Sequence, residues 1–203
     1  MGSVVRIESV RTLLTIAAFY SLYIQHIDAK SAFLNGQSDV ELYVQQPEGF
    51  VDQRYPDHAL KLNKSLYGLK QAPRIWYLLL CQTITALGFR SCDSDPSIYV
   101  HDEQRTILAV YVDDILVIGS QSTCAEFYDI ISKSFQMEDK GAVKSFLGLN
   151  IVRAPDGAIS INQSGYIDRM IEHFHMQEAN PAKTPLESSL PLKKATDTDK
   201  RTT

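Results

Sequence analysis

The sequence has few cysteines and no long hydrophobic run. Its 203 residues include three cysteines, Cys81, Cys92 and Cys124, which are odd in number and widely spaced. No Cys-x-x-Cys pair occurs, so neither a disulfide framework nor a zinc site is indicated, and a reducing compartment is expected. The apolar stretches are far shorter than a membrane span, and we expect neither a signal sequence nor a membrane anchor.

Positive charge is also scarce. Twenty lysines and arginines stand against 24 aspartates and glutamates, which gives a formal net charge of −4. Proteins that grip a nucleic-acid duplex usually neutralise its phosphates with Lys and Arg. If this chain binds nucleic acid, its basic residues must cluster on one face, or the main binding surface is missing.

Apolar residues, by contrast, make up 44% of the chain, which is ample for the core of one domain. Hydrophobic periodicity predicts helices over 4–21, 72–87, 122–135 and 166–174. Strand-like runs alternate with them, at 23–27, 42–44, 59–62, 98–100, 106–118, 145–151 and 158–162. From residue 181 the chain is polar, which is typical of a loose tail.

The most informative feature is a pair of adjacent acids, Asp113 and Asp114, between the apolar runs 106–112 and 115–118. Such runs belong in a sheet core, so the two carboxylates stand at the tip of a hairpin. Like charges held together repel, so one carboxylate takes a proton or both share a cation. Mg²⁺ would satisfy both at neutral pH because it prefers oxygen ligands. Taken alone, Asp-Asp is more often ordinary turn chemistry.

A third acid, Asp28, ends the strand-like run 23–27. If that strand lies beside the hairpin, three carboxylates converge on one rim of the sheet. Three carboxylates and the phosphates of a nucleotide can form a two-metal site for phosphoryl transfer. On its own, Asp28 would more often be a helix N-cap, since helix-like spacing follows it.

A series of short segments then carries a family resemblance. In chain order they are Asp28–Gly36, Tyr43–Phe50, Leu62–Trp76, Asp95–Tyr99, Tyr111–Asp114, Phe146–Gly148, Ser164–Ile167 and Thr184–Pro185. A lone Tyr-x-Asp-Asp is a weak signal, whereas this series in this order is specific. It resembles the reverse transcriptase domain of copia-type (Pseudoviridae) LTR-retrotransposon polyproteins, which implies an RNA-directed DNA polymerase.

The resemblance implies an α+β fold, the palm of a right-hand polymerase, in which helices pack on one face of an antiparallel sheet. The reverse transcriptase domain is expected over 4–186. Partial fingers and most of the palm would occupy 4–120, and the rest of the palm, a primer-grip hairpin and a thumb remnant would occupy 121–186. A polar, disordered tail is expected over 187–203.

By the same resemblance, Asp28, Asp113 and Asp114 are the catalytic and metal-binding acids. Asp28 and Asp113 would hold two Mg²⁺ ions, with Mn²⁺ as a substitute, between a primer 3′ hydroxyl and an incoming triphosphate. Asp114 would be a supporting carboxylate. The reaction is in-line phosphoryl transfer, in which catalysis depends on positioning and on charge neutralisation.

The resemblance also implies nucleotide-binding residues. Phe33 would lie under the sugar, where its ring would clash with a 2′-hydroxyl and favour deoxynucleotides. Tyr67, Gly68 and Lys70 would pack against the incoming nucleotide, with Gly68 allowing close backbone approach. The simpler interpretations are a core aromatic for Phe33 and a solvated face for Lys70.

Primer and template contacts are expected from a third group, namely Tyr111, Phe146, Leu147, Gly148 and Arg74. Tyr111 would line the primer terminus, and Phe146–Gly148 would form the primer grip. Arg74 follows Pro73 near a predicted helix N-terminus, which favours phosphate, although a solvated face is an equally good interpretation. Without its position after the Asp113–Asp114 hairpin, Phe146–Gly148 would be unremarkable strand core.

The implied partners are an RNA or DNA template–primer duplex, deoxynucleoside triphosphates, and the RNase H and integrase regions of a parent polyprotein, with no membrane. Family members work in cytoplasmic virus-like particles and deliver DNA to the nucleus. The sequence has no counterpart of the family's N-terminal fingers segment or RNase H region, so we expect an internal piece of a polyprotein.

Two functions therefore stay open at this point. The first is an active reverse transcriptase domain, and the second is a catalytically inactive palm fragment of a decayed copy that binds nucleic acid or metal weakly. A palm-like nucleotide cyclase is disfavoured by Phe33 and by the segment Tyr67–Pro73, which belong to template-directed synthesis.

Overall fold

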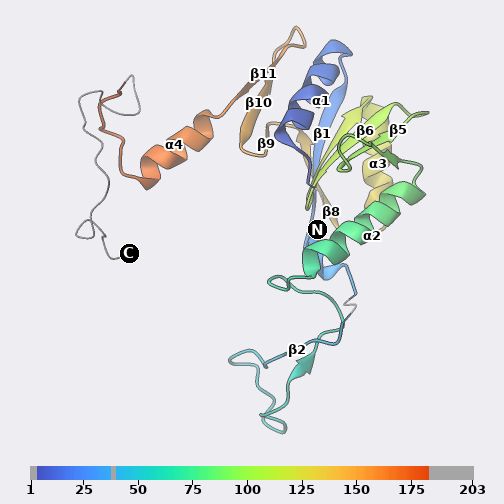
Figure 1. Ribbon diagram of the computed structural model, residues 1–203, viewed down its shortest axis with the longest axis vertical. Coiled ribbons are helices and arrows are strands. Elements are labelled where there is room, and N and C mark those ends of the chain that lie inside the picture. The colour runs from blue at the N-terminus through green and yellow to red at the C-terminus, as the bar shows by residue number, and fades with distance from the viewer. Residues whose placement is uncertain (1–3, 38–39, 183–203) are drawn as a thin grey trace, which may run out of the picture. The chain divides into compact units, whose positions relative to one another are not determined.

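The computed structural model describes residues 4–37 and 40–182. Its chain divides into two compact units, residues 1–163 and residues 164–203, and each is described by itself. The first unit contains three antiparallel sheets and helices α1 (Ile7–Phe19), α2 (Ala72–Ala86) and α3 (Gln121–Ile131) (Figure 1). The second contains helix α4 (Ser164–His173).

The main sheet has six strands in the order β4-β5-β6-β7-β1-β8, and every neighbouring pair is antiparallel. Its strands are β1 (Tyr23–Ala29), β4 (Arg90–Ser91), β5 (Ile98–His101), β6 (Thr106–Tyr111), β7 (Asp114–Gly119) and β8 (Met137–Ala142). The hairpin β6–β7 comes from the predicted run 106–118, and β1 lies between β7 and β8. The strand predicted to carry Asp28 is therefore a neighbour of the acidic hairpin.

Helices cover both faces of the main sheet, so the expectation of helices on one face alone is wrong. Strands β1, β6 and β7 carry buried residues on both sides, so each side of the sheet needs cover. On one side α2 and α3 bury Trp76, Leu80, Ile84, Cys124 and Phe127 against Ile27, Val110, Ile115 and Val117. On the other side α1 buries Val10, Leu13, Leu14 and Ala17 against Ile24, Ala109, Leu116 and Ile118.

Helix α1 begins on a cap supplied from a distant segment. The carboxylate of Asp95 accepts hydrogen bonds from the Arg6 N–H (3.2 Å), the Ser9 hydroxyl (2.6 Å) and the Ser97 N–H (3.1 Å). Burial of Asp95 would raise its pKa, but these hydrogen bonds outweigh burial and lower it. The segment Asp95–Tyr99 thus has a structural task, the anchoring of α1 to the main sheet.

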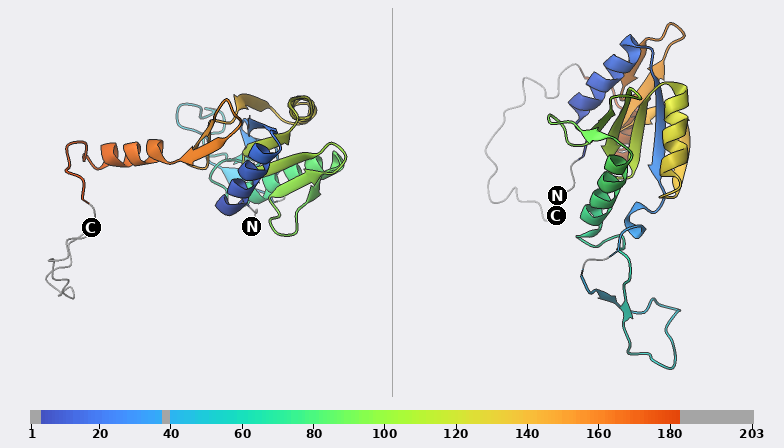
Figure 2. Two further views of the ribbon diagram at one scale, coloured as in Figure 1. Left: turned by 90° about the horizontal axis from the view of Figure 1, so that it is seen from above. Right: turned by 90° about the vertical axis from the view of Figure 1, so that its right-hand side faces the viewer.

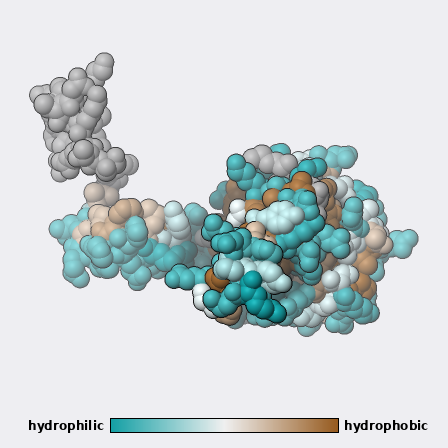
Figure 3. Space-filling view, turned by 90° about the horizontal axis from the view of Figure 1, so that it is seen from below, coloured by the Kyte–Doolittle hydropathy of each residue, from teal (hydrophilic) through white to brown (hydrophobic). Residues whose placement is uncertain are grey.

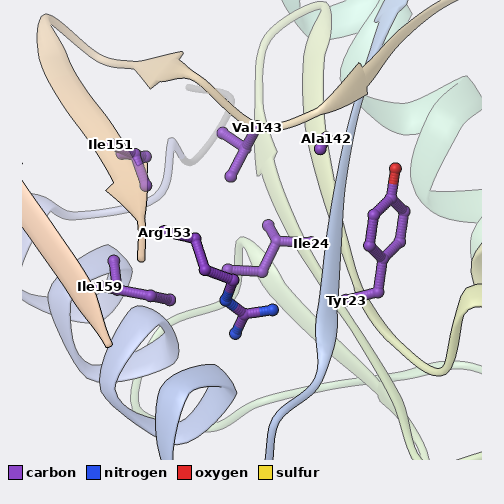
Figure 4. Close-up of a pocket in the computed structure, with 7 residues that line it drawn as sticks. All are labelled: Tyr23, Ile24, Ala142, Val143, Ile151, Arg153 and Ile159. Atoms are coloured by element: carbon purple, nitrogen blue, oxygen red, sulfur yellow. The ribbon is translucent and has the colours of Figure 1, made fainter. Parts of the chain in front are cut away.

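The C-terminal end of α1 is held by Arg153, from a second, three-stranded sheet of β9 (Ser145–Phe146), β10 (Leu149–Arg153) and β11 (Ile159–Asn162). The guanidinium donates to the carbonyls of Leu22 (2.6 Å) and Ala17 (3.0 Å). A positive charge is stabilising at the C-terminal end of a helix because the last carbonyl groups lack hydrogen-bond partners within the helix. The Arg153 side chain lines a cavity of about 80 Å³, together with Tyr23, Ile24 and Ile151 among others (Figure 4).

The strands predicted at 42–44 and 59–62 are observed as β2 (Tyr43–Val44) and β3 (Leu60–Lys61), which pair with each other outside the main sheet (Figure 2). Helix α3 begins one residue before the predicted start, and the hydroxyl of Ser120 accepts the N–H of Thr123 (3.1 Å). Strand β8 was not predicted at all, because its sequence is polar.

Helix α4 is amphipathic, and hydrophobic and hydrophilic residues take different sides of it (Figure 3). Its large apolar residues are exposed, among them Tyr166, Ile167 and Met170. The predicted tail at 187–203 and the segment Thr184–Pro185 lie outside the described residues. Within the described part of the chain, no helix is long and apolar enough to cross a membrane, and the three cysteines are free.

Replacing Asp95 with Ala should lower the free energy of unfolding by about 2 kcal/mol, because α1 loses its cap and buried N–H groups lose their acceptor. Thermal and urea unfolding followed by circular dichroism would measure this. Asp93→Ala is the matched control, since Asp93 is an exposed acid in the same segment. Equal stability of the two variants would show that the Asp95 cap contributes little.

Candidate functional site

The pairing of β1 with β7 brings two of the predicted acids together. Asp28 lies directly opposite Asp114 in this antiparallel pair. Across the neighbouring pairs, Tyr111 lies opposite Asp114 and Glu138 lies opposite Asp28. Because directly opposed residues project from the same face, these four side chains form a row across β6, β7, β1 and β8. Asp28 is thus part of a strand, and not the N-cap of a helix.

The third acid, Asp113, lies with Val112 in the tight turn between β6 and β7. Val112 has φ 56°, an unfavourable conformation for a β-branched residue. Two hydrogen bonds hold the turn: the Trp76 indole N–H donates to the Val112 carbonyl (2.8 Å), and the Ala29 N–H donates to the Asp113 carbonyl (2.9 Å). The buried Trp76 of α2 and the end of β1 therefore fix the position of the acidic turn.

Two side chains that the sequence did not single out contact the acids. The ammonium of Lys140, from β8, lies 3.1 Å from Asp28 Oδ1 and 3.2 Å from Asp114 Oδ1. His26 Nε2, two residues before Asp28 on β1, lies 2.6 Å from the same Asp114 oxygen. Asp114 Oδ1 is therefore bound by two side chains, His26 and Lys140. The Lys140 ammonium is shared between Asp28 and Asp114.

The surroundings of Asp113 and Asp114 shift the pKa values of the two carboxyl groups in opposite directions. The hydrogen bond with His26, followed by the contacts of Lys140, lowers the pKa of Asp114 even though burial opposes this. Burial, followed by the charges of Asp114 and Asp28, raises the pKa of Asp113. Burial acts to lower the pKa of Lys140, but its contacts with Asp28 and Asp114 outweigh burial and raise it. Of the two adjacent acids, Asp113 is therefore the one whose negative charge is less well compensated.

The donor set suits a hard cation, because Mg²⁺ prefers carboxylate oxygens. Two of the three carboxylates already converge on one positive charge, the Lys140 ammonium. In residues 4–37 and 40–182, however, no three His, Cys, Asp or Glu side chains are close enough together to bind a metal. The acids therefore fit a metal by their chemistry, while their present arrangement is organised around Lys140.

The predicted nucleotide-binding residues form a second group. The rings of Phe33 and Tyr67 are in contact, with centroids 4.7 Å apart, and the Ser65 hydroxyl donates to the Phe33 carbonyl. Phe33 lies in a short 3₁₀ turn, Ala32–Leu34, where it is partly buried and packs against the core beside α2. Gly68 has φ +94°, which glycine tolerates best.

Close packing explains another glycine of the same segment. A side chain at Gly36 would meet Ile75 of α2 at 2.2 Å, so only glycine fits here. The segments Asp28–Gly36 and Leu62–Trp76 thus pack directly on each other. Lys70 and Arg74 are exposed at the start of α2, and within the described residues neither forms a hydrogen bond or ion pair with the acids.

The predicted primer-grip residues form the β9–β10 turn. Leu147 and Gly148 both have positive φ, 50° and 77°, as a tight hairpin turn requires. Phe146 is buried, and its ring packs edge-on against His26 with centroids 5.7 Å apart. The turn is therefore linked to Asp114 through His26.

Simple sequence signals could have found part of this arrangement. His26 alternates with Asp28 on a strand, so both side chains take the same face. Lys140 and Glu138 were missed because β8 is a charged edge strand without an apolar pattern. Charges are common on edge strands because they discourage pairing with other chains.

Comparison with known proteins gives a consistent result. The family described as "Reverse transcriptase (RNA-dependent DNA polymerase)" matches residues 1–188. The retrovirus-related Pol polyprotein from transposon TNT 1-94 of Nicotiana tabacum is 40% identical over 196 residues, which cover 94% of this chain and 15% of that protein. The Pol polyprotein from transposon RE1 of Arabidopsis thaliana is 36% identical over 189 residues, which cover 92% of this chain and 13% of that protein.

A shorter relative is the putative transposon Ty5-1 protein of Saccharomyces cerevisiae. It is 35% identical over 172 residues, which cover 82% of this chain and 55% of that protein. The chain thus spans only about a seventh of the length of the two plant polyproteins and about half of the yeast protein.

Without metal, replacing Asp113 with Asn and replacing Asp114 with Asn should have different effects on the free energy of unfolding. Asp114→Asn should lower the free energy of unfolding at pH 7 by about 1 kcal/mol, because His26 and Lys140 lose a charged partner. Asp113→Asn should leave stability unchanged or raise it, because ionisation of Asp113 is unfavourable in the folded chain. Urea unfolding of both variants measures the difference.

The pH dependence gives an independent check of the same contacts. A folded-state pKa below the unfolded value of about 3.9 contributes stability above that pH, and this is lost as the pH falls through the folded value. The stability difference between wild type and Asp114→Asn should therefore shrink below about pH 4. A difference that stays constant down to pH 2 would contradict the assignment.

Proposed function

Because this chain belongs to the reverse transcriptase family of copia-type retrotransposon Pol polyproteins, we propose that it is an RNA-directed DNA polymerase domain. The observation that supports this best is the placement of Asp28 opposite Asp114, with Asp113 in the adjoining turn. Three carboxylates at one rim of a sheet suit nucleotidyl transfer to a primer 3′ hydroxyl. In this proposal the main sheet is the palm of a right-hand polymerase.

Asp28 and Asp113 are the proposed ligands of two Mg²⁺ ions, for which Mn²⁺ can substitute. When bound, the ions supply charge neutralisation at the triphosphate and lower the pKa of the attacking hydroxyl. Asp114 is a supporting carboxylate, since its Oδ1 is already engaged by His26 and Lys140. The turn held by Trp76 and Ala29 keeps Asp113 in place, which favours catalysis by positioning.

Nucleotide selection is proposed for the pair of Phe33 and Tyr67. Their rings are in contact, and in this proposal the Phe33 ring obstructs a 2′-hydroxyl. Gly68 leaves open space beside its backbone, which suits close approach of a nucleotide. The exposed Lys70 and Arg74 at the start of α2 would reach phosphates of the nucleotide and of the template.

The primer terminus is proposed to lie along Tyr111, opposite Asp114, with the Phe146–Gly148 turn as the primer grip. The proposed partners are an RNA or DNA template–primer duplex and deoxynucleoside triphosphates. RNase H and integrase regions of a parent polyprotein are further proposed partners, since the plant relatives are several times longer than this chain. Cytoplasmic virus-like particles and the nucleus are the proposed locations.

Primer extension on an RNA template with Mg²⁺ tests the proposal. Wild type should extend the primer, and Asp113→Asn should reduce the rate at least about a hundredfold, because a neutral amide binds Mg²⁺ less well than the carboxylate that it replaces. Asp129→Asn, an exposed acid on α3, is the matched control. Absence of extension by folded wild-type protein would favour the inactive-fragment alternative.

Phe33→Val should relax sugar selection. Removal of the ring opens space for a 2′-hydroxyl, so the ratio of ribonucleotide to deoxynucleotide incorporation should rise at least about tenfold. The measurement is single-nucleotide incorporation with each substrate. Phe19→Val on the exposed face of α1 is the control, and a ratio that Phe33→Val leaves unchanged would refute the role of Phe33.

A further inference from the structure

Lys140 is aimed at the acids by a local irregularity in β8. In the β1–β8 pair, Gln25 lies opposite Ala142 and Ile27 lies opposite Asp139. Only one residue separates the two positions on β1, whereas Lys140 and Gly141 separate them on β8. Strand β8 thus carries one extra residue, a β-bulge opposite His26.

The bulge is fixed by its own interactions. Gly141 has φ +73°, a conformation that other residues seldom adopt. The Gly141 N–H donates to the side chain of Asp139 at 2.7 Å, which closes the turn. Bulges bend a strand and redirect its side chains, so this one sets the direction in which Lys140 points.

From this position the Lys140 ammonium joins three strands. It belongs to β8 and contacts Asp28 on β1 at 3.1 Å and Asp114 on β7 at 3.2 Å. Its side chain is 38% exposed, so the ammonium can withdraw to solvent without opening the core. A lysine, with a compact charge on a flexible stem, suits a contact that must be broken reversibly.

We propose that Lys140 is a resident counter-cation, which neutralises Asp28 and Asp114 in the metal-free chain and must be displaced when a divalent metal binds. The inference rests on the proposed function, because it assumes that Asp28 binds metal. The ammonium already contacts Asp28, one of the two proposed metal ligands, so a metal ion that binds Asp28 competes with Lys140 for this carboxylate. Lys140 therefore weakens metal binding and, in exchange, holds the acids together before metal arrives.

The surrounding charges support this role. Without Lys140, the opposed carboxylates of Asp28 and Asp114 would repel each other across β1 and β7. Lys30, the other lysine nearby, lies 3.8 Å from Glu138, at the outer end of the same row. Among the described residues, Lys140 is the cation that contacts both acids.

The test is Mn²⁺ binding to Lys140→Met, measured by the electron paramagnetic resonance signal of free Mn²⁺. Removing the competing charge should lower the Kd for Mn²⁺ at least about tenfold relative to wild type. Without metal the thermal midpoint of Lys140→Met should lie below that of wild type, and added Mn²⁺ should raise it more than in wild type. Circular dichroism establishes that each variant is folded.

Two controls separate competition from net charge and from misfolding. Lys133→Met removes the same charge from an exposed position outside the carboxylate row, and its Kd should stay within about twofold of wild type. Lys140→Arg keeps the charge and should leave Mn²⁺ binding weak. If Lys140→Met does not fold, Lys140→Gln replaces it in the same comparison.

The outcomes distinguish this inference from the proposed function. If Lys140→Met binds Mn²⁺ no more tightly than Lys133→Met, while Asp28→Asn abolishes binding, Lys140 does not compete and the metal site stands. If Lys140→Met gains affinity for Mn²⁺ but folded wild-type protein does not extend a primer, the inference stands and the polymerase proposal fails. Absence of Mn²⁺ binding in both wild type and Lys140→Met overturns both.

Discussion

The antiparallel pairing of β1 with β7 is the constraint on which the site depends. It places Asp28 directly opposite Asp114 on two interior strands of the main sheet. Carboxylates that face each other across a strand pair repel, and the neighbouring Asp113 adds a third negative charge. The sheet therefore needs positive charge at this rim in every state of the protein. Lys140 supplies it in the structure described, and the proposed metal ions would supply it during catalysis.

The elements around the sheet serve to keep that rim in place. Trp76 holds the carbonyl of Val112 from α2, and its ring packs on Phe135 with centroids 5.0 Å apart. On the opposite face, Asp95 and Arg153 secure the two ends of α1. Both helices thus support the hairpin that carries the acids, although neither supplies a charged group to it. The segment Asp95–Tyr99, which is part of the family resemblance, thus has a structural role although it brings no charged group to the acids.

The sequence allowed prediction of what depends on local pattern. The strands that carry Asp28 and Asp114, and the apolar faces of α1 and α2, follow from periodicity and were placed almost correctly. The two-sided cover of the sheet was not foreseen, because periodicity identifies the buried face of a helix without saying which face of a sheet it covers. His26 and Lys140 were missed for a related reason. Their importance comes from cross-strand register and from a one-residue bulge, neither of which a single strand's sequence encodes.

The same bulge explains why β8 can be both polar and essential to the site. An edge strand gains little from apolar side chains on its open side, and charges there discourage pairing with another chain. Strand β8 carries Glu138, Asp139 and Lys140 in succession. Asp139 closes the bulge, Glu138 extends the carboxylate row, and Lys140 neutralises its centre. The charged residues of this edge strand thus also determine how far the negative charge of Asp28 and Asp114 is neutralised. A change in the length of this strand would alter that balance without touching any of the three aspartates.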